Sequence, residues 1–185
     1  VALYDFGAKR NIANELAKRN CEVTVFPATT PASEVLEGNF DGIMLSNGPG
    51  DPAEVTDIIA ELKKLSESGM PIFAICLGHQ LMALAHGFKT EKLKYGHHGA
   101  NHPVKDLDTN RVYISTQNHN YVIKDDSIDP AVAKAWFRNV NDGTIEGVEY
   151  LNKNIKTVQF HPEANAGPRD TEYLFDEFIK MMEGK

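Results

Sequence analysis

The segment that most constrains the fold is a short apolar run that ends in a cysteine. Residues 72–75 are β-branched and aromatic and follow Pro71, which is typical of a buried strand. Gly78 permits a tight reversal after Cys76, and residues 80–85 have the composition of a helix. A side chain on such a strand-to-helix turn projects from the top of an α/β sheet, where a nucleophile must stand. The segment therefore predicts an α/β fold and makes Cys76 a candidate nucleophile.

Two interpretations of Cys76 stay open at this point. The free N–H groups and the positive dipole end of the following helix favour the thiolate, which is the reactive form of the side chain. Free cysteine is, however, among the most buried residue types, and a small buried side chain fits the same segment. The turn geometry favours a nucleophile, and the tendency to burial favours a structural side chain. The role of Cys76 therefore has to be judged from other parts of the sequence.

The first half of the chain alternates strands with helices. Strands are expected at residues 1–5, 22–26, 42–45 and 72–75, and helices at residues 9–19, 31–36, 55–65 and 80–85. Such alternation is the signature of a parallel sheet that is covered by helices on both faces.

The second half consists of short strands separated by polar turns. Strands are expected at residues 112–115, 121–123, 131–137, 145–150 and 155–159, and a closing amphipathic helix at residues 173–182. The polar segments 141–143 and 152–154 have the composition of hairpin turns. The sequence thus predicts one α/β domain over residues 1–185. Its mostly parallel central sheet is flanked by helices, and additional mixed or antiparallel strands follow in the second half.

Composition limits the partners and the location of the chain. The 185 residues are 42% hydrophobic and 24% charged, as in one globular domain of ordinary size. A net charge of −7 argues against nucleic acid or an anionic membrane surface as the main partner. The two cysteines do not make a disulfide framework. We therefore expect a cytoplasmic protein with no nucleic-acid partner and no membrane partner.

The segment His161-Pro162-Glu163 offers the two groups that a cysteine nucleophile needs, a base and a carboxylate that orients it. It follows the expected strand 155–159 as Cys76 follows its own strand, and parallel sheets bind ligands beyond the carboxyl ends of their strands. In isolation the segment is better explained as a surface turn. Together with Cys76 on its strand-to-helix turn, the segment is better explained as a catalytic base, His161, followed by the carboxylate of Glu163 that orients it.

The loop of residues 47–52 contains two glycines and two prolines, which give a stiff turn that a ligand can approach closely. The backbone N–H groups of Gly48 and Leu77 are candidates for binding an oxyanion. The loop lacks the Lys-Ser/Thr ending of a phosphate-binding P-loop. A rigid connection between a strand and a helix is the alternative interpretation.

Two further polar segments are candidates for binding. His97, His98 and His102 are close in sequence, but adjacent histidines cannot easily reach one ion, and no cysteine or carboxylate nearby completes a set. We therefore expect no metal site. Residues 117–121 are rich in hydrogen-bonding side chains, and they form either a binding site for a polar ligand or an ordinary polar loop.

Six segments together resemble the class I (triad) glutamine amidotransferase family, and within it the amidotransferase domains of carbamoyl phosphate synthetase small subunits. In chain order they are residues 4–11, 45–52, 75–80, 96–105, 117–119 and 161–164. The glycine-proline loop, the cysteine turn and His-Pro-Glu are typical of the superfamily, whereas the first and the histidine-rich segments indicate the synthetase subunits. The resemblance implies a flavodoxin-like arrangement of the predicted sheet.

The resemblance implies a role for each candidate residue. Cys76 attacks the side-chain amide of L-glutamine and gives a γ-glutamyl thioester and ammonia, while His161 shuttles the proton and Glu163 orients His161. The N–H groups of Gly48 and Leu77 bind the oxyanion. The substrate is held by Gly50, Gln80, Asn118, Asn120 and Tyr121.

The resemblance also implies a larger assembly. The ammonia passes to a separate large synthetase subunit, which uses ATP and Mg to make carbamoyl phosphate for arginine and pyrimidine biosynthesis. We expect no cofactor in this chain, because it carries no nucleotide-binding motif, and we expect a heterodimeric ligase. The chain starts in strand-like sequence at Val1, so we expect a fragment that lacks the N-terminal domain of such subunits.

Two positions depart from the family pattern, and two other functions stay open. Ala74 and Asn120 stand where the family usually has glycine; alanine is small enough to fit, and asparagine tolerates a left-handed backbone. The alternatives are an amidotransferase that serves another synthase and a catalytically silent docking module. The histidine-rich segment argues against the first, and the intact Cys76, His161 and Glu163 argue against the second.

Overall fold

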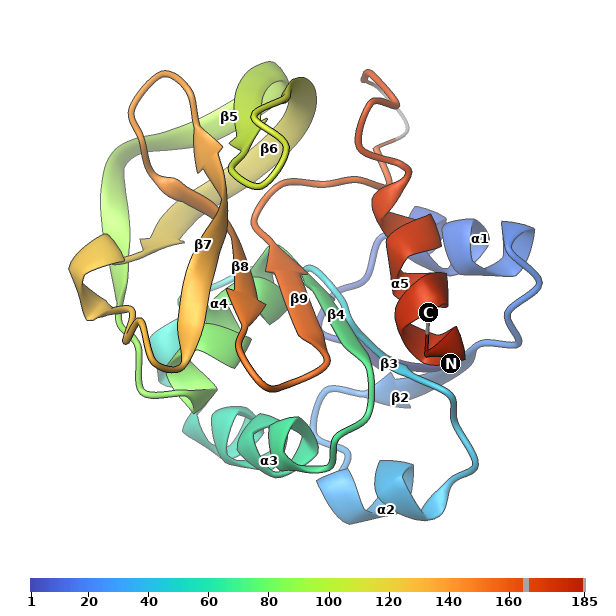
Figure 1. Ribbon diagram of the computed structural model, residues 1–185. Helices are drawn as coiled ribbons and strands as arrows, with labels where there is room; N and C mark the ends of the chain where they lie inside the picture. Colours follow the sequence, from blue (N-terminus) through green and yellow to red (C-terminus); the bar gives the residue numbers. More distant parts are fainter. Residues whose placement is uncertain (165–166, 185) are drawn as a thin grey trace.

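The computed structural model describes residues 1–164 and 167–184, in which nine strands form one sheet (Figure 1). The strand order is β2-β1-β3-β4-β9-β8-β7-β5-β6. The first five strands in this order pair in parallel, and the remaining pairs are antiparallel. The sheet therefore has a parallel half and an antiparallel half, which meet where β9 pairs with β8.

The parallel half is built from short apolar strands. They are β2 (Thr24–Pro27), β1 (Ala2–Asp5), β3 (Ile43–Leu45), β4 (Ile72–Ile75) and β9 (Ile155–Val158). Every residue of β3 and β4 is buried, because helices cover both faces of the sheet at these central strands. The apolar runs predicted as strands at residues 42–45 and 72–75 are therefore the middle of the parallel half.

Helices lie on both faces of the parallel half, as Figure 1 shows. One face is covered by α1 (Arg10–Lys18) and α5 (Leu174–Glu183). The other is covered by α2 (Ala32–Glu37), α3 (Thr56–Glu67) and α4 (Leu77–Ala85). Successive side chains of a strand point to opposite faces, so Phe73 packs toward α5 and Ala74 toward α4. The predicted α/β architecture is thus confirmed.

The antiparallel half continues the same sheet. It contains β5 (Thr90–Asp106), β6 (Val112–Ile123), β7 (Ala133–Asn139) and β8 (Ile145–Tyr150), with two short 3-10 helices at Pro52–Glu54 and Asp125–Ser127 elsewhere in the chain. The strands β5 and β6 form a long curled ribbon at the top of Figure 1. Gly143 and Asn152 have positive φ, at 76° and 58°, in the turns that join β7 to β8 and β8 to β9. These are the two hairpin turns that the sequence predicts.

The β5–β6 ribbon differs from the sequence prediction. No strand was predicted over Thr90–Asp106, and the two strands predicted at 112–115 and 121–123 are one continuous strand, β6. The polar stretch between them is extended and buries Gln117 and His119, which are 1% and 5% exposed. Their side chains bond to each other, with 3.0 Å between His119 Nε2 and Gln117 Oε1. Buried hydrogen bonds rather than apolar contacts hold this strand, so apolar alternation could not reveal it.

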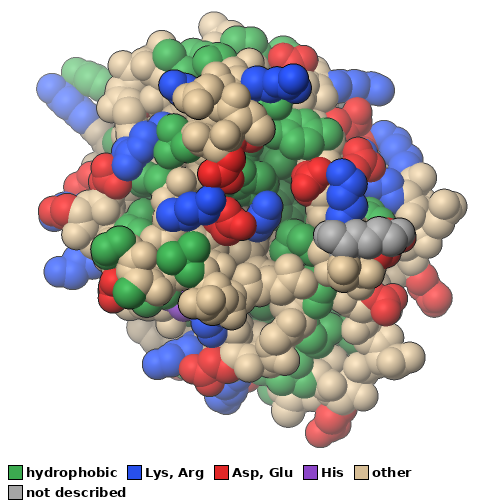
Figure 2. Space-filling model, in the orientation of Figure 1, with side chains coloured by type: hydrophobic (Ala, Val, Ile, Leu, Met, Phe, Trp, Pro, Cys, Tyr) green, Lys and Arg blue, Asp and Glu red, His purple; other side chains and the backbone are tan. Residues whose placement is uncertain are grey.

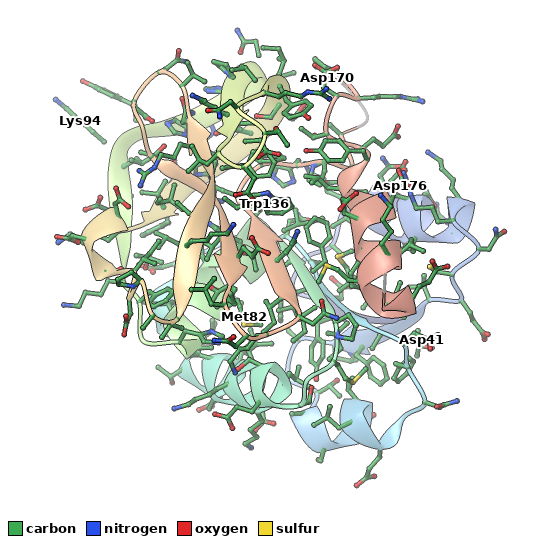
Figure 3. All side chains as sticks on the ribbon, in the orientation of Figure 1. Asp41, Met82, Lys94, Trp136, Asp170 and Asp176 are labelled. Carbon is green, nitrogen blue, oxygen red and sulfur yellow. The ribbon has the colours of Figure 1, made fainter. Side chains whose placement is uncertain are left out.

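The surface carries charges of both signs. Figure 2 shows basic and acidic side chains interspersed over one face of the molecule, and Lys94 projects outward from β5 in Figure 3. Several of the charges are paired, such as Arg19 with Asp176, whose Nε and Oδ1 atoms are 2.6 Å apart. Within residues 1–164 and 167–184, the helices are all too short or too polar to span a membrane.

Candidate active site

Cys76 lies on the turn between β4 and α4, in a strained backbone conformation with φ 55° and ψ −103°. Such a conformation costs an ordinary residue about 1–3 kcal/mol and persists only where its surroundings enforce it. Here the Cys76 N–H donates to the Val158 carbonyl at 2.8 Å, and the Gln80 N–H donates to the Cys76 carbonyl at 3.1 Å. The strained turn stands where the sequence predicts it.

Gly78 allows α4 to start close to the sheet. A Cβ atom at this position would lie 2.8 Å from both the Cβ and the carbonyl oxygen of Leu45 in β3. The Gly78 N–H donates to the Ser46 carbonyl at 3.1 Å, which ties the first turn of α4 to the end of β3. The close packing directs the N-terminus of α4 toward the space in front of Cys76.

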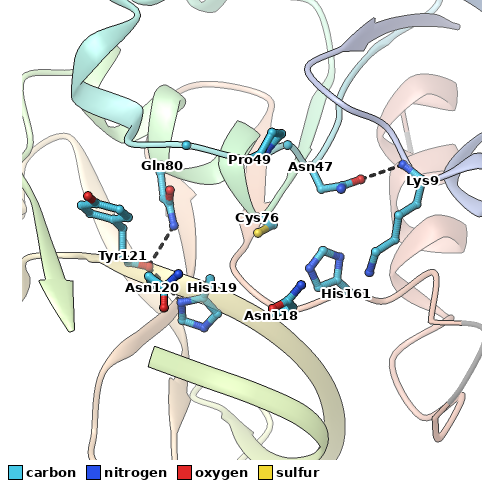
Figure 4. Close-up of a pocket in the computed structure, with 12 residues that line it drawn as sticks. Lys9, Asn47, Pro49, Cys76, Gln80, Asn118, His119, Asn120, Tyr121 and His161 are labelled. Carbon is cyan, nitrogen blue, oxygen red and sulfur yellow. Dashed lines mark hydrogen bonds between the residues drawn. The ribbon is translucent and has the colours of Figure 1, made fainter. Parts of the chain in front are cut away.

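A cavity of about 390 Å³ opens at the carboxyl ends of the parallel strands, with Cys76 at its centre (Figure 4). Its walls come from the loops after β1, β3, β4 and β9 and from β6. The lining residues are Lys9, Asn47, Gly48, Pro49, Gly50, Cys76, Gln80, Asn118, His119, Asn120, Tyr121 and His161. Most of these side chains are polar, so the cavity suits a small polar molecule.

His161 and Glu163 form a buried pair beside the cysteine. The His161 Nδ1 atom lies 2.7 Å from Glu163 Oε1, and the two residues are 2% and 1% exposed. Burial lowers the pKa of His161, but hydrogen bonds with Cys76 and Glu163 outweigh burial and raise it to about 9. Burial raises the pKa of Glu163, and the hydrogen bond to His161 outweighs it and holds that pKa below its ordinary value. The pair therefore favours the protonated imidazole beside the Cys76 sulfur, so that His161 can hold the proton that the thiol releases.

Lys9 is a pocket residue to which the sequence analysis assigned no role. Its Nζ lies 3.5 Å from Glu163 Oε1, and its backbone N–H donates to Asn47 Oδ1 at 3.0 Å (Figure 4). The side chain of Asn11 also donates to the Glu163 carbonyl. The available signal was the position of Lys9 just after β1, at the sheet edge where the other site residues follow their strands.

Gly48 and Leu77, the two expected oxyanion donors, lie in the loop after β3 and at the start of α4. Gly48 lines the cavity, and a Cβ there would lie 2.2 Å from the Phe6 carbonyl oxygen, so only glycine fits. Leu77 is the first residue of α4, where backbone N–H groups lack partners within the helix. Its side chain packs in the core, so it contributes only its backbone.

The other predicted binding residues, Gly50, Gln80, Asn118, Asn120 and Tyr121, all line the cavity. The amide of Gln80 is held in place because its Nε2 donates to the Tyr121 carbonyl at 2.8 Å and to Gln159 Oε1 at 2.9 Å. A hydrogen bond with Asp51 raises the pKa of Tyr121. His119 also lines the cavity; it belongs to the polar segment 117–121, in which no sequence feature distinguishes it from its neighbours.

Asn120 does not use the left-handed backbone that asparagine tolerates. In the described part of the chain, the non-glycine residues with positive φ are Asn20, Cys76, Asn110 and Asn152. Asn120 lies within β6 in extended backbone, which any residue adopts. Its Oδ1 atom is 3.2 Å from His98 Nε2, so the side chain packs on the ribbon.

The histidine-rich segment is divided between two faces of β5. His98 is exposed and contacts Asn118 and Asn120, whereas His97 is buried and bonds through both ring nitrogens, to Glu146 and Asp142. The sequence argument that no carboxylate completes a ligand set was based on neighbours along the chain. The fold corrects it, because Glu146 lies beside His97.

The fold is that of known glutamine amidotransferases. A solved structure of a putative GMP synthase subunit from Thermoplasma acidophilum superposes with a TM-score of 0.85 at 22% identity, covering 100% of this chain and 94% of that one. A glutamine amidotransferase from Thermotoga maritima superposes with a TM-score of 0.69 at 15% identity, covering 100% and 84%. At these identities the likeness shows the fold alone.

The sequence model of the glutamine amidotransferase class-I family matches residues 2–181, and the chain belongs to this family. It is 52% identical over 183 residues to the carbamoyl phosphate synthase small chain of Salmonella typhimurium, covering 99% of this chain and 48% of that protein. It is 51% identical over 185 residues to the small chain of Listeria monocytogenes, covering 100% and 51%. The chain spans about half the length of the curated relatives it matches. The resemblance predicted from the six segments is thus confirmed.

Proposed function

We propose that this chain hydrolyses L-glutamine to glutamate and ammonia as the glutaminase part of a carbamoyl phosphate synthase small chain. The observation that carries the proposal is the position of Cys76. It stands on a strained strand-to-helix turn, within reach of the buried His161–Glu163 pair, in a polar cavity of about 390 Å³.

The reaction proceeds in two steps through the cysteine. The Cys76 sulfur attacks the side-chain carbonyl carbon of glutamine, and His161 carries the thiol proton to the departing nitrogen, which leaves as ammonia. A water molecule then attacks the γ-glutamyl thioester, with His161 accepting its proton and returning it to the sulfur. Glu163 holds the imidazole of His161 in orientation and stabilises its charged form at 2.7 Å.

The negative charge that develops on the carbonyl oxygen is placed near two N–H groups. They belong to Gly48 and Leu77, and the dipole of α4 adds to their effect because Leu77 starts that helix. A Cβ at Gly48 would meet the Phe6 carbonyl, which explains why this donor is on a glycine.

The remaining lining residues hold the amino-acid end of glutamine. Hydrogen-bonding groups come from Gln80 on α4 and from Asn118, Asn120 and Tyr121 on β6, and Gly50 lets the substrate approach the loop. Lys9 is a cation at the opposite wall of the cavity, beside Glu163. Together these groups match a zwitterionic substrate with an amide side chain.

The ammonia serves a synthesis that this chain does not perform alone. Its relatives are named small chains, so a large subunit that uses ATP and Mg to make carbamoyl phosphate is the proposed partner, in a cytoplasmic heterodimer that feeds arginine and pyrimidine biosynthesis. No cofactor is assigned to this chain for the glutaminase step, because thiol, imidazole and carboxylate supply its chemistry.

The test is a steady-state assay of ammonia release from glutamine by the parent chain and two serine variants. Cys76→Ser should lower the rate by at least about 10⁴-fold, since an alcohol at this turn lacks the accessible anion of a thiol. Cys21→Ser is the matched control, because Cys21 is partly buried outside the cavity. It should keep the parent rate. A Cys76→Ser variant as active as the parent would contradict the assignment.

A further inference from the structure

Two histidines and a glutamate from three different strands converge next to the glutamine cavity. His97 comes from β5, His119 from β6 and Glu146 from β8. One ring nitrogen of each histidine and a carboxylate oxygen of Glu146 all lie within 4.8 Å of one another, and the three residues are buried. Glu146 plays no part in the proposed glutamine hydrolysis.

The separations of these atoms are close to those in a tetrahedral metal site. His97 Nδ1 lies 3.2 Å from Glu146 Oε1, and His119 Nε2 lies 3.9 Å from the same oxygen. Ligands bound tetrahedrally to zinc at about 2.0–2.1 Å stand roughly 3.3–3.5 Å apart. The two ring nitrogens lie within 4.8 Å of each other, so side-chain shifts on the order of 1–1.5 Å would bring all three donors to that spacing.

The second nitrogen of each ring is already engaged. His97 Nε2 lies 2.7 Å from Asp142 Oδ2, and His119 Nδ1 lies 2.9 Å from the Tyr121 carbonyl oxygen. Metal-binding histidines usually donate their other N–H to a carboxylate or a backbone carbonyl, which fixes the ring and its tautomer. The remaining nitrogen of His97 therefore faces Glu146, whereas that of His119 lies between Gln117 Oε1, at 3.0 Å, and Glu146 Oε1, at 3.9 Å.

The carboxylate of Glu146 has an unsatisfied oxygen. Glu146 is 0% exposed, and its Oε2 has no hydrogen-bond partner among the residues that the structure describes. A buried carboxylate is costly unless its oxygens are paired or coordinate a cation. The unpaired atom is not Oε1, which faces the two rings, but the second oxygen of the same carboxylate, so the group retains the capacity to bind a further positive partner.

We propose that His97, His119 and Glu146 bind a zinc ion, with Asp142 and the Tyr121 carbonyl orienting the two rings. Two imidazoles and one carboxylate are a ligand set that zinc accepts in proteins. Gln117 Oε1, 3.0 Å from His119 Nε2, is an oxygen that could take the fourth position. The ion would join β5, β6 and β8 and fix the ring of His119, which lines the glutamine cavity.

The test measures zinc bound to the purified chain after incubation with zinc chloride and dialysis, by elemental mass spectrometry. All proteins carry Cys76→Ser, because Cys76 and His161 offer a competing thiol and imidazole. We expect about one zinc per chain, and a visible absorption band of tetrahedral geometry when cobalt(II) replaces zinc. His97→Gln and Glu146→Gln should weaken binding by at least about 100-fold.

Two more variants separate binding from folding. Asp142→Asn changes a partly exposed side chain, 43% accessible, and should weaken zinc binding by roughly 10–100-fold without disturbing the core. His98→Gln is the matched control, since His98 adjoins His97 but faces the other side of β5, and zinc should be retained. The proposal is overturned if the parent binds no zinc, or if Glu146→Gln and Asp142→Asn bind it as tightly as His98→Gln.

Discussion

The parallel and antiparallel halves of the sheet place their functional residues by different means. In the parallel half, apolar strands such as β4 are buried on both faces, Cys76 directly follows β4, and His161 lies three residues beyond the end of β9. In the antiparallel half, residues 118–121 of β6 form a wall of the cavity, and the strand is held by bonds between buried polar side chains such as Gln117 and His119. The parallel half holds the proposed reacting residues, and the antiparallel half holds several of the residues that line the cavity.

The difference predicts two kinds of defect. Changes at the strand ends of the parallel half should act on the chemical step, and changes on β6 should act on substrate affinity. Apolar packing fixes the backbone around Cys76 and His161 rigidly, while side-chain hydrogen bonds set the shape of the β6 wall. Variants in each half of the sheet test this division, and the losses should be greatest at the strand ends of the parallel half.

The largest effect is expected at the base. His161→Asn should lower kcat by on the order of 10⁶-fold and Glu163→Gln by on the order of 10⁴-fold, because the first removes the proton carrier and the second only its orienting carboxylate. Steady-state kinetics with glutamine measures both. Equal losses in the two variants, or an active His161→Asn, would break the assignment of chemistry to the parallel half.

A smaller effect, and one on KM, is expected on β6. Asn118→Ala should raise KM for glutamine about 10–100-fold and leave kcat within a few-fold, because the lost hydrogen bond to a charged group acts on binding. Asn101→Ala is the matched control, an exposed asparagine on the paired strand β5 that does not line the cavity. A fall in kcat as large as that of Glu163→Gln would show that β6 takes part in the chemical step.

The smallest expected effect is a change with pH in the free energy of unfolding. The pKa of His161, about 9 in the folded chain, lies above its ordinary value of 6.5. The folded state therefore binds this proton more tightly, and the resulting stabilisation is complete below pH 6.5 and is lost as pH rises through about 9. A hydrogen bond to Glu146 likewise raises the pKa of His97 to about 9. Protonation of His97 therefore also stabilises the folded chain, and this stabilisation is lost as pH rises through about 9.

The contribution of His161 can be isolated by comparing the parent with His161→Gln. Urea unfolding at pH 6 and pH 9.5 should show that the parent loses on the order of 1–3 kcal/mol more than the variant over this interval. The comparison uses the difference between the two pH values, so a uniform destabilisation of the variant does not matter. An identical loss in both proteins would mean that His161 carries no proton in the folded site.

The same contrast explains what the sequence could and could not predict. The strands around residues 42–45 and 72–75 and the turn at Cys76 follow from apolar runs and glycine positions, which local patterns report well. The strand Thr90–Asp106 was missed because its residues 94–103 are held by side-chain hydrogen bonds and interrupted by β-bulges. The cluster at Glu146 could not be found either, since 49 residues separate it from His97.

Within the site, the predictable residues are those that follow a strand. His161 and Gly48 stand at such positions, and so does Lys9, which the analysis of the parallel sheet could have included. The contact between Lys9 and Glu163 depends on how the loop after β1 meets the loop after β9, and these segments are more than 150 residues apart. A sequence pattern within one segment cannot predict a contact between two segments that are so far apart in the chain.

The most direct test of the account is to trap the covalent intermediate. The chain is mixed with glutamine, quenched with acid within the first turnovers, digested and analysed by mass spectrometry. We expect a γ-glutamyl adduct on the peptide that contains Cys76 and none on the peptide that contains Cys21. Release of ammonia without any adduct on Cys76, or an adduct on another residue, would contradict it.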